Sequence, residues 1–335
     1  MRALVKVLDC RWRKRCAVNG DYKNRESQCL DVSARMPVHF WVLKLSLLPY
    51  AWCNWSVVGG GCAVRAWAIE PLAAGAVIDG RMVALDVIAA ALAQAFRRSG
   101  ATAVDAALSL PASAVMCCEV TLPRGLGEAE MANRLSDELA GSIPYPLDDA
   151  AIDFQVMGVN AQAPGALDVA VAVCRWDALE VIEEVLALAG LCPQVVDIDS
   201  HALQRVACRA SGEVSAVLVV ETDHLVFHHL REAGEHRRDE LRGGDAALQL
   251  ESIVRALDHW LLDSLERGRG SMPEQLLLVG TGAIAALAEQ LQPRLGIACS
   301  VLDPFDGMLG LRDGALRAAA PCLAIASGLA RRSFD

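Results

Sequence analysis

Short apolar runs alternate with amphipathic segments from Val64 onward, and this alternation limits the folds that the chain can adopt. Ala106–Leu110 and Leu276–Val279 have the length and composition of buried strands. Residues 82–96 and 128–140 carry apolar side chains at helical spacing. Because strands and helices alternate, the sequence predicts an α/β protein, and two lobes of similar plan would satisfy the pattern. Further strands are expected at Val169–Val173, Val195–Ile198, Ala216–Val220 and Leu225–Leu230, and further helices at residues 177–190, 245–265 and after Gly282.

Composition excludes several classes of protein. In a chain of 335 residues, 54% are hydrophobic and 21% charged, which is typical of a globular protein large enough for two domains. The 31 basic and 41 acidic side chains give a net charge of -10. A negative surface repels the phosphate backbone of nucleic acids, so no nucleic-acid partner is expected.

The cysteines and the start of the chain bear on where the protein works. Among the 12 cysteines there is no C-x-x-C pair, and those after residue 62 are scattered through apolar runs. The first 16 residues lack the apolar core of a secretory signal. Residues 45–64 carry no charge, but Pro49, Asn54 and three consecutive glycines disfavour a membrane-spanning helix. We therefore expect a cytoplasmic protein with reduced cysteines.

The first 58 residues differ from the rest of the chain. Four of the seven tryptophans lie before residue 56, among basic residues and cysteines and without a sustained helical or strand period. A shifted reading frame or a misassigned start would produce such a composition, and so would a genuine divergent extension. Under either explanation we expect residues 1–58 to be poorly ordered and to lie outside the fold.

One glycine-rich turn is a candidate ligand site. Gly280, Thr281 and Gly282 follow a predicted buried strand and precede a predicted helix. Glycines at such a turn allow a close approach to a nucleotide, and a helix N-terminus favours phosphate. A plain tight turn accounts for the same three residues, so the pattern leaves both interpretations open. The G-x-S-x-G motif of serine hydrolases is absent, and ester or peptide hydrolysis is not expected.

Two polar clusters raise the question of a metal ion. Asp197 and Asp199 come at the end of a predicted strand, before Ser200 and His201, where carboxylates could bind a metal or exchange a proton. A helix cap made by Ser or Asp explains the same residues. The second cluster consists of His224, His228, His229 and His236. No cysteine or third ligand lies there at zinc spacing, so no metal site is expected.

Several longer phrases resemble the PilM family of type IV pilus assembly proteins, relatives of the cell-division protein FtsA with an actin/Hsp70-type fold. The resemblance extends over about residues 60–335. Its most specific part is the proline-rich SIPYPLDD followed by AIDFQV, at residues 142–156. The other matching phrases lie at residues 67–80, 107–116, 186–205, 276–305 and 322–334.

The resemblance implies a two-lobed actin-like fold with an inserted α+β subdomain like the 1C subdomain of FtsA. The implied boundaries are 59–116 for the first part of lobe I, 117–194 for the inserted subdomain, 195–212 for the return to lobe I, 213–320 for lobe II, and 321–335 for a C-terminal helix that packs back on lobe I.

The resemblance also implies a function as a scaffold. PilM-like proteins bind the cytoplasmic N-terminal tail of PilN between the inserted subdomain and lobe I, and connect the inner-membrane PilN/PilO complex to the pilus motor ATPases. Such a protein is cytoplasmic and peripheral to the inner membrane. Whether it self-associates is left open by the sequence. The alternatives are an active ATPase of this or an MSHA-type pilus and an FtsA-like division protein. The residues expected to contact the partner are Ile143, Pro144, Tyr145, Pro146 and Phe154.

ATP and magnesium are the cofactors that the resemblance implies, but two phosphate loops depart from the family pattern. The first loop should fall near residues 41–52, which contain no Asp. The second should carry a glycine, yet residues 220–224 read Val-Glu-Thr-Asp-His. We therefore expect weak or absent nucleotide binding and no hydrolysis, with no catalytic residue. The residues that would line a nucleotide site are Gly280, Thr281, Gly282, Glu221, Thr222, Gly243 and Gly244.

Overall fold

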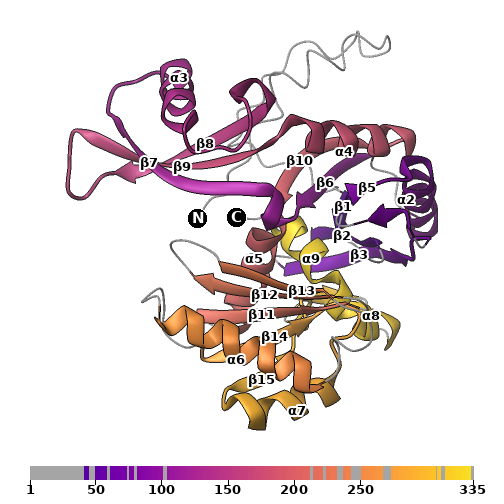
Figure 1. Cartoon of the computed structure of the whole chain (residues 1–335). Coiled ribbons are helices and arrows are strands. Elements are labelled where there is room, and N and C mark those ends of the chain that lie inside the picture. The colour runs from indigo at the N-terminus through magenta and orange to yellow at the C-terminus, as the bar shows by residue number, and fades with distance from the viewer. Residues whose placement is uncertain are drawn as a thin grey trace.

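The computed structural model places two β-sheets one above the other, with helices between them and outside them (Figure 1). It describes residues 41–44, 50–58, 61–73, 75–78, 81–100, 104–211, 214–221, 224–231, 237–242, 250–266, 273–306, 308–310 and 314–332.

Lobe I is built on a six-stranded sheet in the order β10-β6-β1-β2-β3-β16. Neighbouring strands β10, β6 and β1 are parallel, and β1, β2 and β3 form an antiparallel meander. Helices α2 and α4 pack on one face of this sheet through a common apolar core. The elements are β1 (Trp41–Lys44), β2 (Tyr50–Val58), β3 (Gly61–Glu70), β6 (Asp105–Leu110), β10 (Cys192–Ile198), β16 (Leu309–Gly310), α2 (Leu85–Ser99) and α4 (Trp176–Leu188), with a small hairpin of β4 (Val77–Ile78) and β5 (Arg81–Met82).

Lobe II is built on a five-stranded sheet in the order β13-β12-β11-β14-β15. Its outer face is covered by α6 and α7, and the stacked rings of Phe227 and Trp260 belong to this core. The elements are β11 (Val214–Val220), β12 (His224–Arg231), β13 (Arg237–Arg242), β14 (Gln275–Val279), β15 (Ala298–Val301), α6 (Leu250–Glu266) and α7 (Ala285–Leu295).

A helical layer lies between the two sheets and joins the lobes (Figure 1). It contains α5 (Asp199–Ser211) and α9 (Ala324–Arg331), preceded by α8 (Gly314–Ala319) and the short helix η3 (Ala320–Leu323). The apolar core around it includes side chains from both sheets, such as Ala107 of β6 and Leu277 of β14. The two lobes therefore share one hydrophobic core.

The crossing of α5 and α9 is closer than ordinary helix packing allows. A Cβ atom added to Gly328 of α9 would lie 1.9 Å from the carbonyl oxygen of Ala202 in α5. Only glycine lets the two backbones approach this far.

A three-stranded antiparallel sheet projects from lobe I (Figure 1). Its order is β7-β9-β8, and α3 packs on one face through a separate core. The chain leaves lobe I after β6 through the short helix η1 and returns directly into α4. The elements are η1 (Ala112–Ala114), β7 (Val115–Pro123), α3 (Glu128–Leu139), η2 (Leu147–Asp149), β8 (Ala150–Val159) and β9 (Ala166–Arg175). We call residues 115–175 the insertion.

Three of the expected boundaries need correction. Residues 1–58 do not lie wholly outside the fold, because β1 and β2 are inner strands of the lobe I sheet. Their aromatic and β-branched residues suit a pleated sheet even though no clear period announces them. The insertion ends at residue 175 and not at 194, since α4 and β10 pack in lobe I. Finally, β16 pairs with β3 of lobe I although it lies within residues 213–320.

Candidate functional site

A small cavity lies where the insertion joins lobe I. Its volume is about 40 Å³. Apolar side chains line most of it, and the carboxyl groups of Asp153 and Asp197 are the acidic groups among the lining residues. The lining residues are Leu110, Val115, Ala151, Asp153, Ala172, Cys174, Leu179, Val196, Asp197 and Ile198. Because these residues come from β6, β7, β8, β9, α4 and β10, the cavity exists only where the insertion and lobe I meet.

The sheet of the insertion has two different faces, and one of them leads to this cavity. Val169, Val171 and Val173 of β9 pack under α3 in the core of the insertion. The alternate residues Ala170 and Ala172 are buried on the other face, where small side chains leave room for a neighbour. This second face and the ends of β6 and β10 form the walls of the junction.

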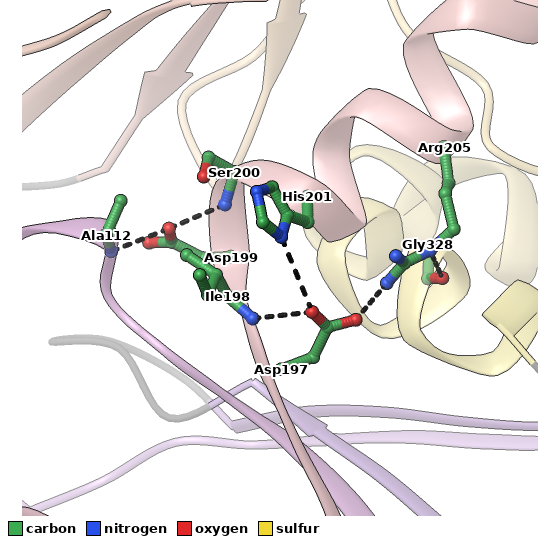
Figure 2. A network of polar contacts seen from close by, with 8 residues as sticks. All are labelled: Ala112, Asp197, Ile198, Asp199, Ser200, His201, Arg205 and Gly328. Carbon is green, nitrogen blue, oxygen red and sulfur yellow. Dashed lines mark hydrogen bonds and ion pairs between the residues drawn. The ribbon is translucent and has the colours of Figure 1, made fainter. Parts of the chain in front are cut away.

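Asp197 is the centre of a polar network at the junction (Figure 2). Its side chain is 1% exposed. One carboxylate oxygen accepts a hydrogen bond of 2.8 Å from the backbone N–H of Ile198 and lies 3.9 Å from Nδ1 of His201. The other oxygen is paired with the guanidinium of Arg205, whose Nε donates to the carbonyl of Gly328 at 2.8 Å. Lobe I, α5 and α9 are thus connected through one buried charge.

The surroundings of Asp197 control the protonation of its neighbours as well. Burial by itself would raise the pKa of Asp197, but the positive charges of Arg205 and Arg332 outweigh burial and hold that pKa below its usual value. Burial lowers the pKa of His201, and the charge of Asp197 only partly opposes this. Both shifts therefore favour the same state at neutral pH, in which Asp197 is ionised and His201 is neutral.

Asp199 ties the entrance of the insertion to α5 (Figure 2). Its Oδ1 atom accepts hydrogen bonds from the backbone N–H of Ala112, at 2.9 Å, and of Ser200, at 2.6 Å. Asp197 and Asp199 thus have structural partners. Within the ranges that the structure describes, no cluster of three or more His, Cys, Asp or Glu side chains could hold a metal ion.

Three of the four clustered histidines are buried in the described part of lobe II. Val226 and Leu230 of β12 face the core between the lobes, whereas Leu225 and Phe227 face α6 and α7. His224 and His228 share the side of Val226, and His229 lies on the opposite side, so β12 separates them. His236 lies outside the described residues.

The residues expected to contact a partner lie on the other side of the insertion from the cavity. Ile143 is buried in the core beneath α3, and Tyr145 and Phe154 pack partly buried against the same core. Pro144 and Pro146 are exposed between them. The guanidinium of Arg175 lies 5.3 Å from the ring centre of Tyr145 and forms an ion pair with Asp177. The proline-rich phrase therefore shapes the insertion itself.

Cys117 on β7 is the exposed one among the cysteines whose side chains the structure describes, and it lies near the junction. Surrounding protein atoms, the neighbouring Cys118 and the charge of Asp197 raise the pKa of its thiol to about 11. Sequence reasoning missed this position, because nothing in the local pattern distinguishes Cys117 from Cys118.

The expected nucleotide residues are only partly described. Thr222, Gly243 and Gly244 lie outside the described residues. Gly280, Thr281 and Gly282 form the turn from β14 to α7, and Glu221 follows β11 directly beside it. Oε2 of Glu221 accepts a hydrogen bond of 2.7 Å from the hydroxyl of Thr281. The four residues are thus brought together, but they contact one another.

Two sheets around a shared helical layer, with a small sheet inserted after β6, define a class of protein: an actin-like two-lobed fold with an inserted subdomain. A family model described as "Type IV pilus assembly protein PilM" matches residues 54–222. The chain belongs to the PilM family of type IV pilus assembly proteins.

Several solved structures are similar to this chain. A structure of a PilM-PilN type IV pilus biogenesis complex has a TM-score of 0.72 and 21% sequence identity, over 89% of this chain and 99% of that chain. The cytoplasmic domain of EpsL, an inner membrane component of the type II secretion system of Vibrio cholerae, has a TM-score of 0.47 and 14% identity, over 88% and 94%. The ethanolamine utilization protein EutJ from Carboxydothermus hydrogenoformans has a TM-score of 0.48 and 12% identity, over 88% and 90%.

No helix among the described residues combines the length and the apolar character needed to cross a lipid bilayer.

Proposed function

We propose that this chain is a scaffold of type IV pilus assembly that binds the N-terminal tail of PilN at the junction between the insertion and lobe I. The cavity at that junction is the observation that carries the proposal. It lies between the insertion and lobe I and has mostly apolar walls. Short peptides are commonly recognised in such grooves, where pockets accept their apolar side chains.

Membership of the PilM family and the fold shared with the PilM of a PilM-PilN complex support this assignment. The proposal extends to the PilN/PilO complex and the pilus motors, which the scaffold would connect from the cytoplasmic side of the inner membrane. Self-association of the scaffold is compatible with this function. An active ATPase and a division protein are not favoured by any feature of the described residues.

The proline-rich phrase has an indirect part in this proposal. Ile143, Tyr145 and Phe154 hold α3 and η2 on the insertion sheet. We propose that these residues, with Pro144 and Pro146, fix the shape of the insertion, and that the tail is contacted mainly by the cavity side of β7, β8 and β9.

A titration of the purified chain with a synthetic peptide of the PilN N-terminal tail tests the proposal. We expect saturable binding with a Kd in the micromolar range, on the order of 1 to 50 μM, as for other short peptide grooves. Absence of binding at several hundred micromolar peptide, on the order of ten times that range, would count against it.

A pair of variants locates the binding site. Cys117→Arg places a long charged side chain beside the junction, and we expect it to weaken binding by about tenfold or more because it obstructs the apolar walls. Met157→Arg is the control, since Met157 is 42% exposed on the same insertion but far along β8 from the cavity lining. It should leave the Kd unchanged within about twofold. The opposite ranking of the two variants would place the tail elsewhere.

A further inference from the structure

The turn between β14 and α7 is packed against the end of β11 more closely than any side chain permits. Gly280 has a φ of 101°, and a Cβ atom on it would lie 2.4 Å from the carbonyl oxygen of Val220. A Cβ atom on Gly282 would lie 2.6 Å from Cγ1 of Val220. The two glycines are therefore required by the contact with Val220 itself.

The backbone N–H groups of this turn donate within the protein. The N–H of Gly280 donates to the carbonyl of Pro321 at 3.0 Å, and that of Gly282 to the carbonyl of Val220 at 2.9 Å. The N–H of Thr281 donates to Oε2 of Glu221 at 3.4 Å. A turn that holds a phosphate needs these donors directed at the ligand, and here they are already used.

Glu221 contacts the turn directly through its carboxylate. Its side chain is 2% exposed. Oε2 accepts from both the hydroxyl and the N–H of Thr281, which are the donors that a phosphate oxygen would require. The backbone N–H of Glu221 donates to the carbonyl of His224 at 3.0 Å, and this bond holds Glu221 at the mouth of the β11–β12 hairpin.

The nucleotide that the fold family implies does not fit these residues. We infer that Glu221, Thr281 and the two glycines form an intramolecular clasp that takes the place of a bound nucleotide and holds β11, the β14–α7 turn and η3 together. Pro321 belongs to η3 in the layer between the lobes, so the clasp fixes lobe II to that layer without a ligand. This inference is independent of PilN binding, and either can fail without the other.

Nucleotide titration of the intact chain tests the first half of the inference. Mg–ATP and Mg–ADP are added separately up to millimolar concentration, and Tm and the heat of binding are measured. We expect Tm to stay constant within about 1 °C, whereas a site filled to 100 times its Kd would raise Tm by about 4 °C. A saturable rise in Tm accompanied by binding heat would overturn the inference.

A double-mutant cycle tests the second half. Glu221→Ala and Thr281→Val each remove one side of the clasp, and each should lower Tm by about 2 to 4 °C, because a buried hydrogen-bonding group loses its partner. The double variant should lower Tm by no more than the larger single effect. If Glu221→Ala does not fold, the nearly isosteric Thr281→Val still supplies the measurement.

Glu274→Ala is the matched control, since Glu274 is an exposed glutamate just before β14. Its Tm should change by less than about 1 °C. Independent, additive losses in the cycle, or no loss from Thr281→Val, would show that Glu221 and Thr281 do not act as one unit.

Discussion

Asp197 illustrates how one residue can make a large molecule sensitive to acid. Its pKa is lowered in the folded state, so its contribution to stability is complete above the unfolded pKa of about 3.9 and is lost as pH falls through the folded value. Asp197→Asn removes this dependence. We expect the variant to be less stable at pH 7 by about 3 kcal/mol, since Arg205 loses its buried partner, and to lose less further stability on acidification.

Denaturant unfolding at several pH values between neutral and about pH 3 measures both effects for Asp197→Asn. Parallel curves for the wild type and the variant would contradict the assignment.

His201 contributes at higher pH than Asp197. Its pKa is lowered by burial, so the unfolded chain binds a proton more readily than the folded chain near the unfolded value of about 6.5. The contribution of neutral His201 is present above that value and is lost as pH falls below it. Asp197 and Arg205 of its own segment and Arg332 after α9 are the charges that act on it. We expect His201→Gln to flatten the decline of Tm between pH 7 and pH 5 (roughly the range below the unfolded pKa), as measured by thermal melts.

The contacts of individual residues are also where prediction from the sequence failed. The pattern G-T-G predicted a tight turn between a strand and a helix, and β14 and α7 confirm it. Whether the glycines face a ligand or the chain itself depends on Val220, which is about 60 positions away, and no local pattern contains that contact. The charged partner of Asp197 comes from α5, and the sequence placed Asp197 at a strand end without revealing Arg205 as that partner.

At the scale of elements, the crossing of α5 and α9 gives a sharp prediction. Gly328→Ala would bring a Cβ atom to 1.9 Å from the carbonyl oxygen of Ala202, so the helices must separate. We expect a loss of roughly 3 kcal/mol or more in the free energy of unfolding, measured with urea. Gly314→Ala, also at a helical glycine but with no atom near the added Cβ, is the control and should be neutral within about 0.5 kcal/mol. Equal stability of the two variants would refute the close crossing.

Periodicity predicted most elements of the body of the chain. β6, α2, α3 and β14 lie within a few residues of their expected positions, because each buries one clear face. β1 was missed because its parallel partner β6 lies far along the chain. β2 pairs with the next strand, β3, but its residues show no clear strand period. The end of the insertion was misplaced for a related reason: α4 has an apolar face in either setting, and only contact with α2 shows that it belongs to lobe I.

At the scale of the whole molecule, the shared core predicts that the lobes unfold together. Leu323 is completely buried in the core between the sheets, and Leu257 is completely buried in the outer core of lobe II. Leu323→Ala should therefore accelerate hydrogen exchange in both β6 and β14, whereas Leu257→Ala should affect β14 more than β6. Each variant is expected to cost about 2 to 5 kcal/mol. Identical exchange profiles of the two variants would contradict the prediction that the core between the sheets couples both lobes and the outer core acts mainly on lobe II.

The position of α9 has a consequence for folding during translation. Lobe I contains the earliest described strands, yet the face of its sheet opposite α2 and α4 is covered by a helix from the very end of the described chain. Translation proceeds at roughly 5–20 residues per second, and domains generally close as soon as they emerge. Here α5 reaches that face before lobe II is made, but α9 follows only after it, so we expect the part of the lobe I sheet that α9 covers to stay exposed until α9 has left the exit tunnel.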